Sequence, residues 1–382
     1  MEKDKIVVGY LSPSSPNDRR ASSGSLYTIA HSLQLIDGVE LLWIPISYDS
    51  IWEKITWYIH AIKRRFHINI PISFSKKQAC FVSSSINLNL VEQCDILFCA
   101  FQAPALYGLK TNKPIVYLSD TTYSLMVDYY YHGISKNEIR AKNEIEQVAL
   151  NKSTSIILSS QWAANSAINE YHQPKEKVNV VEFGANIDEK DIISHDFNYD
   201  GHLDILFLGV DWERKGGKIA VDTCEWLNKN GISSTLHIVG IREIDESIKN
   251  LSFVNFIGFL DKNDKKQYNQ LVTIIKKCHC LLLPTLAECA GIVFCEASAN
   301  GLPVFSHITG GVPNYVNDGI NGHLLPVGSN GEDFGKIIKQ SFESGELKKM
   351  SESSVALYKE KFNWNCWRKK VEIILRQQQN QL

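Results

Sequence analysis

The stretch from Leu281 to Val304 reads LLLPTLAECAGIVFCEASANGLPV, and it determines how the second half of the chain folds. Its three leucines predict a strand buried in a parallel sheet, and Pro284 ends that strand. Gly291 then opens a predicted helix that runs to Ala299, and a Gly-Leu-Pro sequence stops this helix before another apolar strand. The stretch therefore predicts a parallel α/β sheet.

Two carboxylates lie eight residues apart in this stretch, Glu288 in the loop and Glu296 inside the helix. Between them, the amides of Ala290, Gly291 and Ile292 have no earlier turn to accept their hydrogen bonds. An anion placed there would meet several N–H groups and the positive end of the helix dipole. We therefore predict a diphosphate site flanked by carboxylates that could bind sugar hydroxyls. The alternatives are a solvated loop carboxylate and a surface helix residue.

Length and composition indicate two domains of a soluble protein. A chain of 382 residues is too long for one ordinary core. Hydrophobic residues make up 44% and charged residues 21%, and the net charge of −2 gives no reason to expect nucleic acid. No apolar run approaches the ~20 residues of a membrane span. The N-terminal MEKDKIVVGYLSP is expected to form a first strand rather than a signal peptide.

The nine cysteines predict a reducing, cytoplasmic setting, because they are odd in number and contain no CxxC pair. Cys278-His279-Cys280 is interpreted as strand filler rather than a metal site, since further ligands are lacking. The eleven histidines form no H-x-x-x-H or H-E-x-x-H pattern. We therefore expect neither a disulfide framework nor a metal site.

Apolar patterning divides the chain into two alternating series of strands and helices. In the first half, strands are expected at residues 5–11, 39–44, 95–101, 114–118, 155–158 and 178–182, with helices at 25–35, 51–66, 135–150 and 161–171. Ser135 and Glu138 have the spacing of a capping box. In the second half, strands are expected at 202–208, 234–239, 253–256, 281–283, 304–307 and 323–326, with helices at 216–228, 262–277, 291–299, 332–342 and 364–375.

The polar segment 184–202 separates the two series and is expected to connect two domains. Each series predicts a doubly wound parallel sheet, and ligands of such folds bind beyond the carboxyl ends of the strands. We expect the two domains to face one another across a cleft. Trp364, Trp367, Val371 and Ile374 share one helical face, which predicts a docked terminal helix.

A second candidate site follows the strand that ends at Leu208. Arg214 and Lys215 precede a predicted helix, where cations oppose the dipole unless an anion offsets them. Gly216 and Gly217 would let a phosphate approach the backbone closely. The sequence therefore favours phosphate binding here over a solvated basic turn.

Two features of the first half are ambiguous. Asp120 follows a predicted strand, where it could orient or deprotonate an acceptor hydroxyl, or cap the following helix. The helix at 51–66 carries Trp52, Trp57 and Phe66 and ends in a Lys-Arg-Arg cluster. It could rest on an anionic membrane that holds a lipid-linked acceptor, or simply pack in the core with its cations complementing the helix dipole.

At this point the motifs resemble those of a known family. The RKGG sequence after LGV, the E-x7-E spacing of Glu288 and Glu296, and the continuation GLPVFSHITGGVPNYVNDGINGHLLP resemble the retaining GT-B glycosyltransferases of glycosyltransferase family 4, also called group 1. Weaker matches occur at Ser23-Gly24, at SSQWAANSA from Ser159, and at FGAN from Phe183. The resemblance is specific in the second half and generic in the first.

The resemblance implies a fold and its division. It implies an α/β GT-B protein with two facing Rossmann-like domains. Residues 1–187 would bind the acceptor and 188–363 the nucleotide sugar, with the helix at 364–382 docking back on the first domain. Such enzymes need no metal, because Arg, Lys and helix N-termini neutralise the leaving group.

The resemblance also implies roles for individual residues. Glu296 would hold the nucleotide ribose and Glu288 the donor hexose, while Arg214 and Lys215 would neutralise the diphosphate. The remaining donor contacts would come from backbone groups, at Gly291, Ile292 and Val293 for the diphosphate, at Gly258, Phe259 and Leu260 for the base, and at Gly24 for the closing N-terminal loop.

Three departures from the family pattern are present. Val210 and Asp211 follow Gly209, where many members have an Arg; the diphosphate loop reads E-C-A-G instead of E-G-F-G; and Asp120 lies where many relatives carry a His near the acceptor.

The implied function is a metal-independent, retaining hexosyl transfer from a nucleotide diphosphate sugar, UDP more than GDP. The acceptor would be a hydroxyl of a glycan, a lipid-linked sugar or a protein, in glycan or cell-surface polysaccharide synthesis. The expected location is the cytoplasm, with peripheral contact at the inner face of a membrane and no nucleic-acid partner. The alternatives are a nucleotide-sugar epimerase of the same fold and a catalytically silent subunit that binds a glycan or a sister chain.

Overall fold

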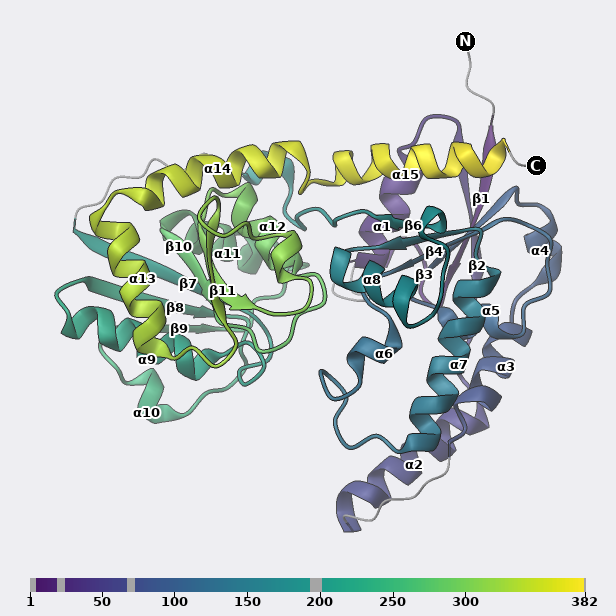
Figure 1. Cartoon of the computed structure of the whole chain (residues 1–382), viewed down its shortest axis with the longest axis horizontal. Coiled ribbons are helices and arrows are strands. Elements are labelled where there is room, and N and C mark those ends of the chain that lie inside the picture. The colour runs from purple at the N-terminus through teal and green to yellow at the C-terminus, as the bar shows by residue number, and fades with distance from the viewer. Residues whose placement is uncertain (1–4, 19–24, 67–72, 193–200, 381–382) are drawn as a thin grey trace. The chain divides into compact units, whose positions relative to one another are not determined.

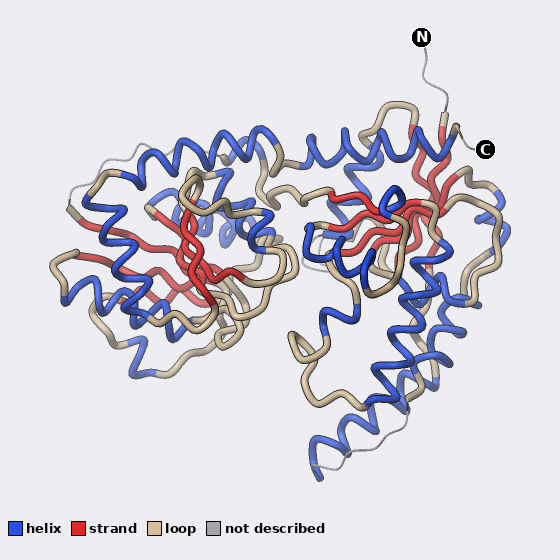
Figure 2. The backbone as a smooth tube through the Cα atoms, viewed as in Figure 1, coloured by secondary structure: helices blue, strands red, loops and turns tan. Residues whose placement is uncertain are grey.

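The computed structural model describes residues 5–18, 25–66, 73–192 and 201–380. The chain divides into two compact units (Figure 1). Unit 1 comprises residues 1–181 and 368–382, and unit 2 comprises residues 182–367. Figure 2 shows strands at the centre of each unit and helices around them. The α/β class predicted from the sequence is confirmed.

Unit 1 is built on a six-stranded sheet whose strands pair in parallel in the order β2-β1-β3-β4-β5-β6. The strands are β1 (Ile6–Ser12), β2 (Val39–Pro45), β3 (Ile96–Ala100), β4 (Ile115–Ser119), β5 (Ser155–Leu158) and β6 (Val178–Val180). The helices are α1 (Ser25–Gln34), α2 (Ile51–Phe66), α3 (Ser75–Ser84), α4 (Leu88–Glu92), α5 (Ala103–Tyr107), α6 (Tyr123–Met126), α7 (Lys136–Lys152) and α8 (Gln161–Asn169).

Unit 2 contains a second parallel sheet in the order β12-β11-β10-β7-β8-β9. Its strands are β7 (His202–Leu208), β8 (Ser233–Val239), β9 (Val254–Gly258), β10 (Cys280–Leu283), β11 (Val304–Ile308) and β12 (Gly322–Pro326). Its helices are α9 (Gly217–Lys229), α10 (Glu246–Lys249), α11 (Lys265–Lys277), α12 (Ile292–Ala299), α13 (Gly331–Glu343) and α14 (Glu346–Glu360). This strand order is that of a Rossmann sheet, with its topological switch between β7 and β10.

The terminal helix α15 (Trp364–Gln379) begins in unit 2 and continues in unit 1. Its apolar face is buried at Trp367, Val371 and Leu375, which confirms that the helix is docked. Arg376 anchors the later part in unit 1 by donating to the carbonyl of Asp37 at 2.6 Å. Residues 184–187, part of the expected connection, pack within unit 2, where the amide of Ala185 donates to Phe362 O at 3.2 Å.

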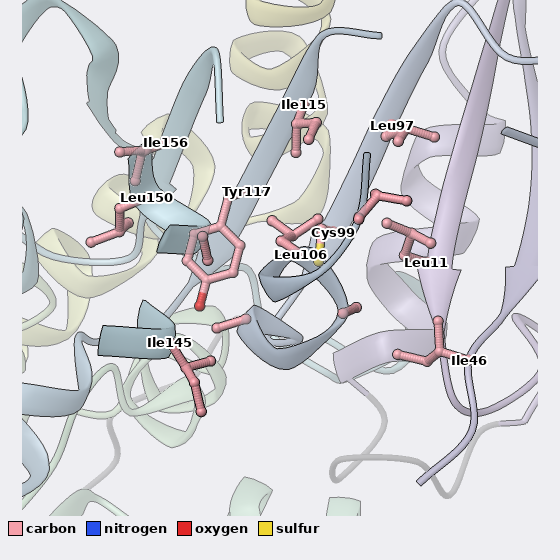
Figure 3. Packing of buried hydrophobic residues seen from close by; sticks show 14 of the residues in the cluster. Leu11, Ile46, Leu97, Cys99, Leu106, Ile115, Tyr117, Ile145, Leu150 and Ile156 are labelled. Carbon is pink, nitrogen blue, oxygen red and sulfur yellow. The ribbon is translucent and has the colours of Figure 1, made fainter. Parts of the chain in front are cut away.

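The core of unit 1 lies between the sheet and its helices. The central strands β3 and β4 are buried along their whole length, which explains why they read as continuous apolar runs. In Figure 3, Tyr117 extends from β4 toward Ile145 of α7, within a cluster of aliphatic side chains. A tyrosine hydroxyl therefore lies at the edge of an otherwise apolar core.

Local signals were read correctly in most elements but not in all. Ser135 caps α7 by accepting from the amide of Glu138 at 3.3 Å, as the capping box predicts. The carboxylate of Glu138, however, accepts from Ser75 Oγ at 2.5 Å rather than completing the box. Helices α3, α4, α5, α6, α10 and α14 were not predicted, because most are short and the amphipathic pattern of the longer ones was overlooked.

Candidate active site

The main candidate site lies at the topological switch of unit 2. The neighbouring strands β7 and β10 lead into the loops 209–216 and 284–291, which precede α9 and α12 respectively. Carboxyl ends of adjacent parallel strands at a switch point are where doubly wound folds bind ligands. The two loops are joined by hydrogen bonds, since the amide of Leu286 donates to Arg214 O at 2.8 Å. Two motifs seventy residues apart therefore form one site.

A buried ion pair joins these loops. The ammonium of Lys215 donates to the carboxylate of Glu288, and these residues are only 7% and 8% exposed. Arg214 Nη1 lies 3.9 Å from the same carboxylate oxygen and donates to Ala287 O at 2.9 Å. The alternatives of a solvated basic turn and a solvated loop carboxylate are thus wrong. In this structure the carboxylates of Glu288 and of Asp211, which lies 3.4 Å from Arg214 Nε, offset the two cations beside the start of α9.

Gly216 and Gly217 are required by close packing, whereas the sequence analysis explained them by the approach of a phosphate. Gly216 has φ of 74°, and a Cβ there would lie 2.2 Å from the carbonyl oxygen of Pro284. A Cβ on Gly217 would lie 2.2 Å from the ring of Trp212. These glycines are needed for packing inside the protein, whether or not a phosphate approaches.

The N-terminus of α12 completes this side of the site. Its N-cap, Gly291, adopts the left-handed conformation with φ of 80°. The helix starts at Ile292, so its first amides, including that of Val293, have no intrahelical acceptor. The amide of Gly311 fixes the preceding loop by donating to Glu288 O at 3.0 Å. The helix therefore presents the positive end of its dipole beside a cation-rich loop.

Glu296 lies inside α12 and is 5% exposed, so the alternative of a surface helix residue is wrong. Its partner is Lys262, whose ammonium lies 2.5 Å from Glu296 Oε1. The sequence analysis did not identify Lys262. Its position directly after the Gly258–Leu260 loop was the one feature that could have indicated a role in the site.

The loop that was predicted to meet a nucleotide base follows β9. The carbonyl of Gly258 accepts from the amide of Gly240 at 2.8 Å, which joins this loop to the end of β8. Phe259 is 42% exposed, and the guanidinium of Arg242 lies 4.3 Å from its ring centroid. Leu260 is half-buried. An exposed aromatic ring paired with a guanidinium is a surface on which a planar ring could stack.

Asp120 belongs to unit 1, and its alternative as a helix cap is wrong. Thr122 is the N-cap of α6, while Asp120 lines a cavity of about 690 Å³ beyond the ends of β3 and β4. Buried Glu146, which sequence reasoning missed, lines the same cavity. Burial, together with the charge of Asp120, raises the pKa of Glu146 to about 7, although the hydrogen bond from Tyr117 lowers it. Gly24 lies outside the described residues.

The described residues offer no alternative metal or disulfide chemistry. The ranges that the structure describes contain no group of three or more His, Cys, Asp and Glu side chains placed to hold a metal ion. All nine cysteines are free thiols. None of the helices described here combines the length and the hydropathy needed to cross a bilayer.

The two doubly wound units and the cation-rich switch point define a protein of the GT-B class. Residues 188–355 match the family model described as Glycosyl transferases group 1, which confirms the resemblance to that family. The matched residues lie within unit 2 and include both carboxylates, the basic pair and α12.

Relatives and solved structures agree with this class. An uncharacterized glycosyltransferase of Methanocaldococcus jannaschii is 26% identical over 60% of this chain and 61% of its own. The amylovoran biosynthesis glycosyltransferase AmsK of Erwinia amylovora is 26% identical over 41% and 40%. The chain thus spans less than two thirds of the length of these relatives.

The fold is shared more widely than the sequence. Anabaena HepE, solved in complex with UDP and glucose, has a TM-score of 0.64 at 17% identity and covers 97% of this chain and 99% of its own. Sucrose-phosphate synthase from Thermosynechococcus elongatus has a TM-score of 0.70 at 12% identity, with 98% and 99% covered.

Proposed function

We propose that the chain is a metal-independent, retaining glycosyltransferase that moves a hexosyl group from a UDP-sugar to an acceptor hydroxyl. The observation that carries the proposal is the cluster of Arg214, Lys215 and Glu288 beside the N-terminus of α12. Arg214 lies 3.4 Å from Asp211 and 3.9 Å from Glu288, and Lys215 pairs with Glu288, so a diphosphate bound there would replace these carboxylate contacts with its own oxygens. The UDP and glucose bound to the similarly folded Anabaena HepE favour a UDP-linked hexose.

The proposed chemistry breaks the bond between the anomeric carbon and the diphosphate oxygen, which keeps the electron pair. Arg214, Lys215 and the amides of Gly291, Ile292 and Val293 stabilise that developing charge, so that no divalent cation is needed. Glu288 gives up part of its contact with Lys215 and accepts from hexose hydroxyls, while Glu296 accepts from the ribose. The Gly258–Leu260 loop and Gly24 complete donor binding.

The acceptor oxygen forms the new bond to the anomeric carbon on the face that the diphosphate leaves. Its proton passes to the leaving phosphate oxygen or to the carboxylate of Asp120, which we propose as the orienting base. The acceptor is a glycan, lipid-linked sugar or protein hydroxyl. AmsK, named for amylovoran biosynthesis, supports a role in polysaccharide synthesis, and the nine free thiols support a cytoplasmic setting.

Exposed residues of α2 support peripheral membrane contact. Ile51, Trp57, Tyr58 and Ile62 are between 43% and 65% exposed, so the alternative of a core stripe does not hold for these side chains. In Figure 1 this helix projects from the rest of unit 1. Its end carries the basic sequence Lys-Arg-Arg, and a basic helix with an apolar stripe suits an anionic bilayer surface.

Vesicle binding tests the membrane contact. Sedimentation with vesicles of 30% phosphatidylglycerol in phosphatidylcholine should carry the native chain down and leave the Ile51→Ser/Ile62→Ser variant in solution. Leu88→Ser, which alters another exposed aliphatic side chain of unit 1, is the matched control. Equal sedimentation of all three proteins would rule out α2 as the contact.

Nucleotide release tests the transfer itself. The chain is incubated with UDP- and GDP-hexoses in EDTA, with and without saccharide acceptors, and the anomeric configuration of the product is read by NMR. We expect UDP release with retention. An epimerised donor would identify the epimerase instead, and silence across the panel would identify a catalytically silent subunit.

A further inference from the structure

We infer that unit 1 has a second ligand site, in a polar cavity at the amino ends of β5 and β6, and that this site binds an uncharged saccharide away from the place of transfer. We call it the amino-edge cavity. That the bound saccharide belongs to the glycan being built rests on the proposed function, whereas the binding itself is argued from side chains of unit 1 alone.

The amino-edge cavity lies at the edge of the sheet opposite to the cavity that holds Asp120. Its volume is about 690 Å³, and it is lined by the turn between α7 and β5, by the loop that leads into β6, and by the end of α15. Because the strands pair in parallel, their amino ends share one edge of the sheet and their carboxyl ends the other. The four residues of β5 span roughly 13 Å, so a ligand in this cavity is separate from one at the carboxyl ends.

The lining of this cavity is polar, and most of it carries no charge. The hydroxyl side chains of residues 153–155 border it, together with four carboxamides, those of Asn179, Gln377, Gln378 and Asn380. Carboxamides and hydroxyls both donate and accept hydrogen bonds, as the hydroxyl groups of a sugar do. Empty cavities in proteins are typically apolar, so a polar cavity of this size is expected to hold water or a polar ligand.

The two charged groups of the lining favour a neutral ligand. The ammonium of Lys177 donates to the carbonyl oxygens of Leu150 and Asn151 at 2.6 and 3.3 Å, at the end of α7. It also donates to Gln173 Oε1 at 3.1 Å, so its three N–H groups are already used within the protein. Glu176 supplies one exposed carboxylate. One ammonium held by three oxygens and one solvated carboxylate form neither a cation cluster for a phosphate nor an anion cluster for an amine.

A buried acceptor in the lining lacks a donor. Gln378 is only 5% exposed, yet its Oε1 has no hydrogen-bond partner among the described residues. Leaving a buried acceptor unpaired is destabilising, and native proteins rarely do so without a reason. The last carbonyls of α15, which ends at Gln379, also have no donors within the helix. A hydroxyl group of a saccharide in the cavity supplies the donor that Gln378 lacks.

The experiment measures ligand binding to the full chain by saturation-transfer NMR without nucleotide. Three neutral trisaccharides, maltotriose, chitotriose and mannotriose, are compared with spermidine, methyl phosphate and N-acetyl-triglycine amide, which represent a cation, an anion and a peptide. We expect at least one trisaccharide to bind, and the three other probes to bind at least about fivefold more weakly. Preferential binding of any of those three would overturn the inference. Absence of binding by all trisaccharides would overturn it in favour of a cavity that holds water alone.

Gln378→Leu assigns the binding to the amino-edge cavity, because it removes the unpaired oxygen and nearly keeps the size of the side chain. We expect the trisaccharide to bind about fivefold to tenfold more weakly, while the melting temperature stays the same or rises. Gln379→Leu alters the next residue of α15, which does not line the cavity, and should leave binding unchanged. Unchanged binding by Gln378→Leu would place the saccharide elsewhere and contradict the site.

Gln377→Ala provides a second variant that cannot be explained by misfolding, because this side chain is exposed at the rim of the cavity. We expect trisaccharide binding to weaken about twofold to threefold, less than in Gln378→Leu. A larger loss in Gln377→Ala than in Gln378→Leu would contradict the role given to the buried oxygen.

The two proposals fail in different ways. If Gln378→Leu weakens trisaccharide binding but the native chain releases no UDP from UDP-hexoses, the saccharide site stands and the glycosyltransferase proposal fails. If UDP is released but Gln378→Leu binds trisaccharides as the native chain does, the proposed function stands and the inference fails. If both proposals hold, Gln378→Leu should raise KM for a trisaccharide acceptor while kcat stays the same.

Discussion

The two candidate sites hold charge in opposite ways. At the switch point of unit 2, Arg214 and Lys215 are paired with the carboxylates of Asp211 and Glu288, so cations and carboxylates balance in number. In the cavity of unit 1, Asp120 and Glu146 lie near each other, and their mutual repulsion helps keep the proton on Glu146. One fold type thus carries paired charges in one unit and a buried acid that keeps its proton in the other. The side chains at strand ends, not the sheets, set this difference.

The largest expected effect concerns the buried ion pair at the switch point of unit 2. Lys215→Ala leaves the carboxylate of Glu288 buried without its main partner, which should cost about 3–5 kcal/mol of unfolding free energy. Lys215→Met/Glu288→Leu removes both charges and should recover most of that loss. Urea denaturation measures both variants. Lys218→Ala, on the exposed face of α9, is the control. A loss as large in the control would show that the burial of the pair is not the cause.

Asp120→Asn tests the other site without altering shape. If its carboxylate orients or deprotonates the acceptor, transfer should fall about 10²–10⁴-fold while UDP affinity stays within twofold. Initial-rate transfer assays measure the rate, and titration with UDP measures the affinity. If the transfer rate and the UDP affinity fell equally, Asp120 would have a structural role and not a role in the reaction.

The protonation of Glu146 should appear in the pH dependence of stability. Its pKa of about 7 lies above the model-peptide value of 4.5, so the folded state binds the extra proton. The contribution to stability is therefore complete below about pH 4.5 and is lost as pH rises through about 7, on the order of 3 kcal/mol. Glu146→Gln should flatten this slope in urea denaturation between pH 5 and 8. An unchanged slope would assign it to another group.

The carboxylate of Asp204 in unit 2 should make stability depend on pH in the opposite direction. Burial raises the pKa of Asp204, but bonds from His237 at 2.6 Å and Lys277 at 3.0 Å outweigh it and lower the pKa to about 2. The resulting stability is present above the unfolded value of about 3.8 and is lost as pH falls through about 2, on the order of 2 kcal/mol. Acid titration of Asp204→Asn against the native chain should show a smaller loss in the variant.

The sequence predicted the site at the switch point of unit 2 but did not predict most of the cavity of unit 1, and the difference has a physical reason. Glu288 and Lys215 each lie in a short strand-loop-helix segment, where glycine, proline and charge positions are readable locally. The cavity joins α2, α3, α6 and α7, and Glu146 looks like any other glutamate on a helix. Glu146 becomes a buried acid only because α7 packs against the sheet, where Tyr117 donates a hydrogen bond to its carboxylate.

The same distinction between local patterns and long-range packing holds for the helices and strands. Buried strands such as β3 and β4 were predicted within about a residue, because parallel strands are continuously apolar. Helix α14 was missed although it is fifteen residues long. Two of its four buried positions are the serines Ser351 and Ser354, and its partner α12 lies fifty residues earlier, so tertiary packing supplies most of its stability.

The most direct test of the donor site is the affinity for UDP, measured by calorimetry in EDTA on the native chain and on Lys215→Met/Glu288→Leu. That variant is expected to keep the fold and the net charge while it removes the ammonium proposed to contact the diphosphate. The native chain should bind UDP without metal, and the variant should bind at least ~30-fold more weakly, since each charge-assisted contact to phosphate contributes about 2 kcal/mol. Equal affinity in a folded variant would contradict the claim that the switch point of unit 2 holds the donor.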